Sequence, residues 1–237
     1  MKTLILAAHP DDEVLGMGGT IKKLTKEGNV VKIVIMATGL AARRSTTFKN
    51  NSLYHISKKT SEKITIQIES LRRDSKKACK ILGVTDVEFM NFLDNEMDKS
   101  SNLEITKSIE NIIKIFKPER IFTHSPYDVN VDHRSIYHAT LTATRPNSSY
   151  SVPEVISFEV PSSTEWYFPN NFQPNIFIDI SKELKFKLNA LKAYKTEIKK
   201  FPHPRSIEGL EHVSKRWGTV SGFKAAEAFS LVRKLQK

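Results

Sequence analysis

The chain has 237 residues and carries 37 lysines and arginines against 26 aspartates and glutamates, for a formal net charge of +11. This length suits one domain with a sizeable core, and 39% apolar residues with only 9 glycines and 10 prolines exclude a fibrous, low-complexity or wholly disordered chain. A single cysteine, Cys79, excludes an intramolecular disulfide or a thiolate cluster within one chain and favours a cytoplasmic protein.

Short apolar runs alternate with amphipathic stretches along the chain, which is typical of a parallel sheet with crossover helices. Strands are predicted at Thr3–Ala8, Val30–Ala37, Asp86–Phe92, Arg120–His124, Val155–Glu159 and Asn175–Asp179. Helices are predicted at Asp12–Glu27, Glu62–Leu82, Leu103–Phe116, Asp132–Thr144 and Ser181–Ile198, with one or two more over Ile207–Lys234. We therefore predict one Rossmann-like, three-layer α/β/α domain over residues 1–237 with a mostly parallel sheet. No stretch is long enough to predict a membrane span.

The positive charge is concentrated in residues 40–82, which hold 11 basic and 3 acidic residues. The part at about 40–62 lacks apolar periodicity and is predicted to be a mobile basic loop after the second strand. A nucleic-acid partner is one interpretation, but no RNA-binding signature or interleaving of aromatic and basic residues accompanies the charge. The alternative is a cationic lid in which Arg43 and Arg44 favour an anionic, for example phosphorylated, substrate.

A glycine cluster in the first predicted helix, Gly16-Met17-Gly18-Gly19, begins like a dinucleotide-binding fingerprint. The pattern fails because Ile21 stands where the third glycine belongs, and because the glycines lie inside the helix, away from the turn that would cradle phosphate. Close packing of the helix against the sheet is the better interpretation.

Ionisable residues follow the predicted strands at the end where open α/β sheets bind their ligands. His9-Pro10-Asp11-Asp12-Glu13 follows the first strand and Asp128-Val129-Asn130-Val131-Asp132-His133 follows the fourth. An acidic helix N-terminus accounts for one or two of these carboxylates but not for the whole cluster. Two imidazoles and a carboxylate meeting there would form a three-ligand site with an open position, which is typical of catalytic zinc. Zn²⁺ is the first choice, and Fe²⁺, Co²⁺ and Mn²⁺ are chemically compatible alternatives.

These two motifs and the order of elements resemble the LmbE/PIG-L family of zinc-dependent N-deacetylases, with weaker support from His203-Pro204-Arg205-Ser206 and residues 225–229. The resemblance implies a hydrolase that removes acetyl from an N-acetylated amino sugar, such as an N-acetylglucosamine that is free, phosphorylated, or linked to a nucleotide or lipid. It further implies that His9, Asp12 and His133 hold the metal and that Asp11 is the general base. Homo-oligomers are common in the family.

Two roles around this centre stay open. Asp132 either fixes the tautomer of an imidazole or only caps a helix. Asn130 stands where many relatives have a histidine that stabilises the oxyanion, so either the metal and Asn130 suffice or His124 supplies the missing cation. Because of this departure, a second interpretation stays open, in which the protein is a relative that binds metal and sugar without turnover.

Further side chains are candidates for substrate contact because they follow the strands or lie in the C-terminal motif. They are Arg43, Arg44, Asp94, Asn95, His124, Asp128, His203 and Arg205. The aromatic run Trp166-Tyr167-Phe168 is either a wall on which sugar rings stack or ordinary packing.

Overall fold

The structure, a computed structural model, describes residues 1–38, 58–147, 150–169 and 172–236, and for residues 58–64 it describes the backbone alone. The strands are β1 Lys2–Ala7, β2 Val30–Ala37, β3 Asp86–Phe92, β4 Arg120–His124, β5 Glu154–Phe158, β6 Ile176–Asp179 and β7 Ala226–Lys234. The helices are α1 Asp12–Lys26, α2 Lys58–Leu82, α3 Asn102–Phe116, α4 Val131–Ala143, α5 Leu184–Leu191 and α6 Ile207–Ser221, with short 3₁₀ turns η2 Met97–Lys99 and η3 Thr164–Trp166.

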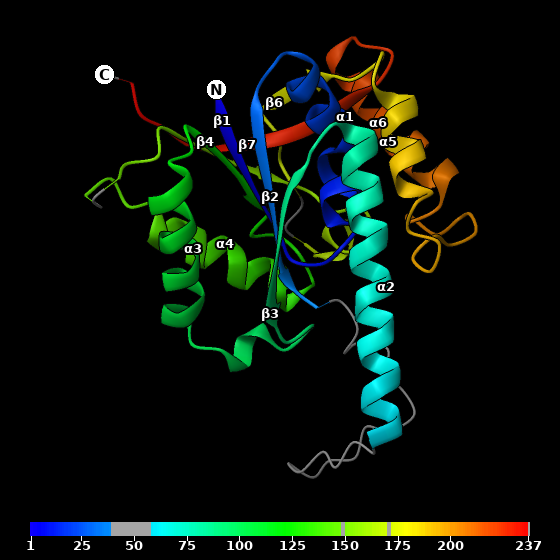
Figure 1. The fold of residues 1–237 in the computed structure, drawn as a ribbon. Coiled ribbons are helices and arrows are strands. Elements are labelled where there is room, and N and C mark those ends of the chain that lie inside the picture. Colours follow the sequence, from blue (N-terminus) through cyan, green and yellow to red (C-terminus); the bar gives the residue numbers. More distant parts are fainter. Residues whose placement is uncertain (39–57, 148–149, 170–171, 237) are drawn as a thin grey trace.

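The strands form one sheet in the order β3-β2-β1-β4-β5-β7-β6 (Figure 1). β1 to β5 pair in parallel, and β7 runs antiparallel to both of its neighbours. α1, α2 and α5 pack together over one face of the sheet, and α3 and α4 pack over the other. The predicted three-layer α/β/α domain with a mostly parallel sheet is therefore confirmed.

The prediction of helix throughout Ile207–Lys234 is wrong in its second half. α6 stops at Gly222, whose φ of 79° ends the helix in the left-handed region. The chain then re-enters the sheet as β7, between β5 and β6. The first four residues of β7 are all buried, so the strand lacks the alternation of apolar and polar residues that would have identified it.

Two further helices have boundaries that differ from the predictions. α2 begins at Lys58, so the end of the predicted loop at 40–62 is helical. α5 covers only Leu184–Leu191, and the predicted continuation to Ile198 consists of turns. Arg43 and Arg44 lie outside the described residues.

Close packing explains the glycine cluster of α1, as the sequence indicates. A Cβ at Gly16 would lie 2.5 Å from the Phe158 ring, and one at Gly19 would lie 2.7 Å from Ile180. α1 is also broken at Met17, which has non-helical backbone angles. The glycines therefore let the helix bend and approach the sheet.

The break in α1 creates a new set of helix-terminal N–H groups inside the protein. The carboxylate of Glu227 from β7 accepts hydrogen bonds from the N–H groups of Gly19 and Thr20, at 2.9 and 2.6 Å. Lys187 of α5 donates to the same carboxylate at 2.6 Å, and both charged side chains are buried. Glu227 thus caps the second half of α1 from the far end of the chain.

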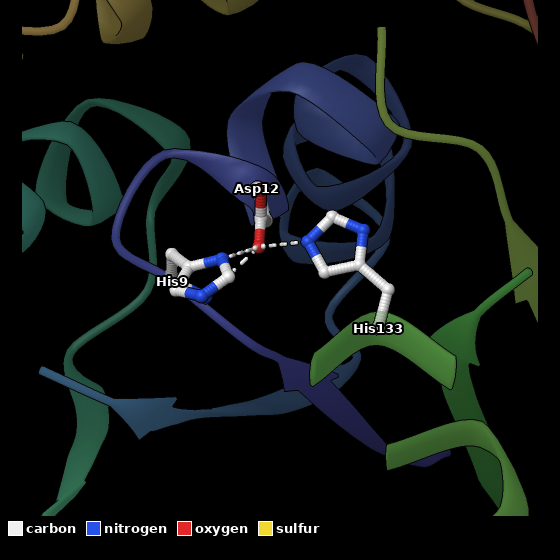
Figure 2. Close-up of side chains that lie close together, drawn as sticks. All are labelled: His9, Asp12 and His133. Atoms are coloured by element: carbon white, nitrogen blue, oxygen red, sulfur yellow. Dashed lines mark hydrogen bonds and ion pairs between the residues drawn. The ribbon is translucent and has the colours of Figure 1, made fainter. Parts of the chain in front are cut away.

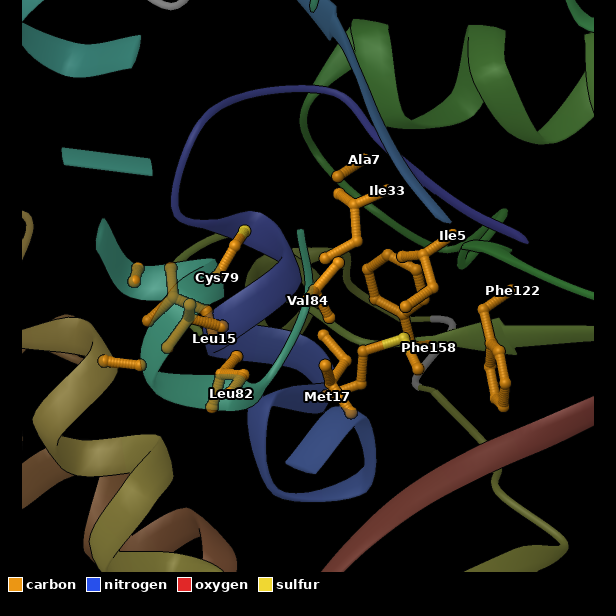
Figure 3. Close-up of a cluster of buried hydrophobic side chains, with 14 of the residues drawn as sticks. Ile5, Ala7, Leu15, Met17, Ile33, Cys79, Leu82, Val84, Phe122 and Phe158 are labelled. Carbon is orange, nitrogen blue, oxygen red and sulfur yellow. The ribbon is translucent and has the colours of Figure 1, made fainter. Parts of the chain in front are cut away.

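Two apolar cores lie on the two faces of the sheet. One packs the strands against α1, α2 and α5 and includes Leu15, Met17 and Phe158 (Figure 3). The other packs them against α3 and α4. Burial on both faces explains why β1 and β2 read as continuous apolar runs. None of the described helices combines the length and apolar character needed to cross a membrane.

Candidate metal centre

Neighbouring strands bring the two sequence motifs together at the carboxyl edge of the sheet. β1 pairs directly with β4, so the turn from β1 into α1 lies beside the turn from β4 into α4. His9 and Asp12 come from the first turn and His133 from the first turn of α4 (Figure 2). All three side chains are buried, with exposures of 7%, 0% and 1%.

The three side chains meet at one oxygen atom. His9 Nδ1 and His133 Nε2 each lie 3.2 Å from Asp12 Oδ2, and Figure 2 shows both rings directed at this carboxylate. The backbone N–H of His9 donates to the same oxygen at 2.8 Å and fixes the turn. Asp12 Oδ1 and His133 Nε2 have no hydrogen-bond partner among the described residues. These buried, incompletely satisfied atoms indicate that something else binds between them.

The far side of each imidazole ring faces a carboxylate. His9 Nε2 lies 2.9 Å from Asp132 Oδ2 and 3.0 Å from Asp94 Oδ1, and His133 Nδ1 lies 2.9 Å from Asp128 Oδ2. An ionised carboxylate only accepts hydrogen bonds, so each of these nitrogens carries the proton. A neutral ring then presents the lone pair of its other nitrogen to Asp12. Two nitrogens and one carboxylate oxygen fit a divalent cation such as Zn²⁺.

Electrostatics show how strongly this cluster attracts positive charge. Burial lowers the pKa of His133, but the charges of Asp12 and Asp128 outweigh it and raise that pKa to about 9. Burial likewise opposes protonation of His9, yet hydrogen bonds to Asp12, Asp132 and Asp94 hold its pKa well above the ordinary value. The cluster therefore takes up either protons or a metal ion, and the two compete for the same lone pairs.

The carboxylates behind the rings are themselves anchored. Asp132 accepts from the backbone N–H groups of Asn95 and Met97, at 2.6 and 3.0 Å. Asp132 thus lies against the ring of His9, while Asn130 occupies the N-cap of α4 and accepts from the N–H of Asp132 at 2.8 Å. The anchoring fixes the orientation of the ring before any ligand arrives.

Asp128 is anchored by hydroxyl groups that sequence reasoning missed. Ser163 and Thr164, which follow β5, donate to Asp128 Oδ2 at 2.9 and 2.7 Å. Asp128 was predicted to contact substrate, and the structure places its buried carboxylate on His133. Serine and threonine are too common for a single sequence to reveal such partners.

Asp11 lies beside the three-residue cluster in a strained turn. Its φ of 110° falls in the region that side chains other than glycine rarely adopt. Its N–H donates to Glu13 Oε2 at 3.1 Å, and the buried Glu13 carboxylate in turn accepts from the Tyr194 hydroxyl. Both Asp11 carboxylate oxygens are buried without a hydrogen bond among the described residues. Burial raises the pKa of Asp11 to about 8. Sequence reasoning assigned no role to Glu13 or Tyr194.

His124 and Asn130, the two candidates for oxyanion stabilisation, are both held in hydrogen bonds. His124 Nε2 accepts from the N–H of Ala8 at 2.8 Å, and the ring stacks on His133 with 4.0 Å between centroids. Burial and the neighbouring His133 hold the pKa of His124 well below its ordinary value, so the ring is neutral. The side-chain amide of Asn130 donates to Asn95 Oδ1 at 3.1 Å.

The remaining predicted contact residues fall into two groups. Asp94 and Asn95 follow β3: Asp94 Oδ1 lies 3.0 Å from His9 Nε2, and the side-chain amide of Asn95 donates to the same Asp94 oxygen at 3.1 Å. His203 and Arg205 lie in the segment before α6, where His203 Nδ1 accepts from the Arg205 N–H at 3.0 Å. Arg205 reaches the cluster itself, because its Nη1 lies 3.4 Å from Asp11 Oδ2.

In sequence, the chain is similar to known deacetylases. The family model described as PIG-L: GlcNAc-PI de-N-acetylase matches residues 4–144. The diacetylchitobiose deacetylase of Thermococcus kodakarensis is 27% identical over 243 residues, covering 98% of this chain and 83% of that protein. A Bacillus cereus protein named "probable N-acetyl-alpha-D-glucosaminyl L-malate deacetylase 2" is 27% identical over 198 residues, covering 82% of each.

The fold alone does not determine the reaction. The solved structure of a 4-carboxy-2-hydroxymuconate hydratase from Pseudomonas putida matches with a TM-score of 0.71 and 20% identity, covering 100% of this chain and 98% of that one. A hydratase therefore shares this architecture, and the reaction must be argued from the side chains of the site.

Proposed function

The chain belongs to the PIG-L family of de-N-acetylases, and we propose that it is a metal-dependent hydrolase that removes the acetyl group from an N-acetylated amino sugar. The observation that carries the proposal is the convergence of His9 Nδ1 and His133 Nε2 on Asp12 Oδ2, with both far ring nitrogens bonded to carboxylates. The unsatisfied carboxylate of Asp11 lies next to this cluster in the chain.

His9, Asp12 and His133 would hold the divalent cation, with Zn²⁺ as the first choice and Fe²⁺ or Co²⁺ as alternatives. When bound, such an ion supplies a Lewis acid that acidifies water and polarises the acyl carbonyl. The chain contributes the orientation of both rings through Asp132, Asp94 and Asp128, whose acceptor oxygens already face the far ring nitrogens.

Asp11 is the proposed general base. Its carboxylate oxygens have no competing hydrogen bond among the described residues, so they are available to take a proton from water and return it to the leaving amine. The backbone N–H of Asp11 donates to the Glu13 carboxylate at 3.1 Å, which fixes the backbone from which the Asp11 side chain extends. General acid–base catalysis of this kind contributes a factor of about 10² to 10⁴ to the rate.

The proposed substrate class rests on the names of the relatives. Diacetylchitobiose and an N-acetylglucosaminyl malate are the substrates in those names, and both carry an acetylated amino sugar. Asp94 and Asn95, at the edge of the centre, are the proposed contacts to sugar hydroxyls. Arg43 and Arg44 remain predicted contacts to an anionic group of the substrate.

The test is an acetate-release screen with purified, metal-loaded protein on free, phosphorylated and nucleotide-linked N-acetylhexosamines and on N,N'-diacetylchitobiose. We expect acetate and free amine in equal amounts from at least one substrate. The Asp11→Asn variant is the matched negative control, because it preserves the shape of the site but lacks the proposed general base. Binding of metal and sugar without acetate release would instead support the non-catalytic relative.

A further inference from the structure

Arg205 comes from a part of the chain that the family match does not cover, yet it reaches the proposed general base. The match ends at residue 144, whereas Arg205 lies between α5 and α6. Its Nη1 lies 3.4 Å from Asp11 Oδ2. Within the described ranges, no other lysine or arginine lies within 4.0 Å of that carboxylate.

Asp11 needs such a partner because its carboxylate has no other direct compensation. Its exposure is 1%, and neither oxygen accepts a hydrogen bond from any described residue. A buried carboxylate without hydrogen bonds is costly unless a positive charge lies close to it. The neighbouring carboxylates of Asp12 and Glu13 repel it further. Among the described residues, the guanidinium of Arg205 is the positive group that faces this carboxylate.

The backbone of Arg205 is fixed on both sides. Its N–H donates to His203 Nδ1 at 3.0 Å, and its carbonyl accepts from the N–H of Lys199 at 3.4 Å. The next residue, Ser206, is the N-cap of α6 and accepts from the N–H of Gly209 at 2.8 Å. The Arg205 side chain therefore extends from a backbone that hydrogen bonds hold in place.

The guanidinium is also held along its length. Nε donates to Ser162 Oγ at 2.8 Å, and Nη1 lies 3.5 Å from Glu197 Oε2 as well as 3.4 Å from Asp11. One guanidinium thus links the turn after β5, the segment after α5 and the turn after β1. Two of its three nitrogens, Nε and Nη1, thus face groups of the protein itself.

We propose that Arg205 is a positioning residue, which aligns the Asp11 carboxylate for proton transfer and does not serve as a substrate contact. The inference rests on the proposed function, since it assigns a role within that reaction. It replaces the sequence-based expectation that Arg205 binds a sugar hydroxyl or phosphate. It also means that the region after residue 144 completes the catalytic apparatus.

The first test is structural and does not depend on turnover. In crystal structures of Arg205→Gln, the Asp11 carboxylate should leave its wild-type position while the rings of His9 and His133 stay in place. Arg216→Gln, which changes an exposed arginine on α6 over Trp217, is the matched control and should leave Asp11 unmoved. An Asp11 carboxylate that keeps its position in Arg205→Gln overturns the proposal, whether or not the protein is active.

The second test separates positioning from binding by kinetics. Arg205→Gln should lower kcat about 10- to 100-fold, with KM changed less than about twofold, for neutral and phosphorylated substrates alike. Arg205→Lys should recover part of the lost kcat. In the Asp11→Asn background, Arg205→Gln should cause no further loss, because the group it aligns is already absent. A selective rise of KM for the phosphorylated substrate, or a full additional loss in the double variant, would make Arg205 a substrate contact.

Discussion

The Asp128→Asn variant tests most directly whether the ring of His133 is held for metal binding. Asp128 Oδ2 accepts from His133 Nδ1, Ser163 and Thr164 at 2.9, 2.9 and 2.7 Å, and Oδ1 accepts from the N–H of Asn130 at 2.8 Å. An asparagine at position 128 must place its NH₂ group, which cannot accept a hydrogen bond, at one of these two oxygen positions. In either orientation His133 loses a charged acceptor.

The expected loss follows from that geometry. Carboxylates that orient a ligating histidine are worth about 10- to 100-fold in metal affinity, or about 1.4–2.7 kcal/mol. Zn²⁺ affinity is measured by competition with a chromophoric chelator at fixed pH. Asp98→Asn, which changes an exposed aspartate in η2, is the control and should bind Zn²⁺ like the wild type.

Circular dichroism and thermal melting of the metal-free variant establish that it is folded before affinities are compared. A folded Asp128→Asn protein that binds Zn²⁺ as tightly as the wild type would refute the reasoning. It would mean either that His133 is not a ligand or that its ring needs no support.

Four further outcomes are expected. Asp11→Asn should retain its metal, measured by elemental analysis, and lose about 10² to 10⁴ in kcat for acetate release; an unchanged rate would exclude Asp11 as the base. Zn²⁺ affinity should rise with pH up to about 9, because below the raised pKa of His133 a proton occupies the lone pair that the metal needs; a flat profile by calorimetry contradicts this. Burial raises the pKa of Glu159 from 4.5 to about 7, so the native state binds this proton more tightly than the unfolded state does. The free energy of unfolding should therefore fall as the pH rises from 4.5 to about 7. Glu159→Gln should reduce this fall by up to about 3 kcal/mol, measured by urea unfolding at a series of pH values. Gly19→Ala should destabilise by about 1–3 kcal/mol because its Cβ would meet Ile180 at 2.7 Å, and an unchanged melting temperature would show that α1 can shift.

The centre of the site could be predicted because its residues follow strands at one edge of a parallel sheet. His9 and Asp12 follow the first strand and His133 follows the fourth, so strand order alone brings them close. The structure places all three around one oxygen, as the motifs indicate. Their role as metal ligands stays a prediction until a metal is measured.

The partners of the centre could not be predicted because they come from distant and unremarkable residues. Ser163 and Thr164 hold Asp128 through ordinary hydroxyls 35 and 36 positions away. Arg205 was identified as a candidate contact, but nothing in the sequence indicated that it would meet Asp11. β7 was mistaken for helix because its first four residues are buried on both faces of the sheet and the strand shows no regular alternation of polar and apolar residues.

The place of β7 in the sheet determines when the described sheet can be completed. Among the described strands, β6 pairs only with β7, and β7 also closes the open side of β5. Residues 226–234 are the last of the described strands to leave the ribosome, so until then β5 presents an unsatisfied edge and β6 has no neighbour among those strands. α6, which begins just after Arg205, packs on β6 and β7, and α5 packs on α6 and bonds to β7 through Lys187 and Glu227. In a nascent chain the predicted metal ligands are therefore synthesised early, whereas the helix that follows Arg205 finds its place on the sheet only once β7 has been inserted.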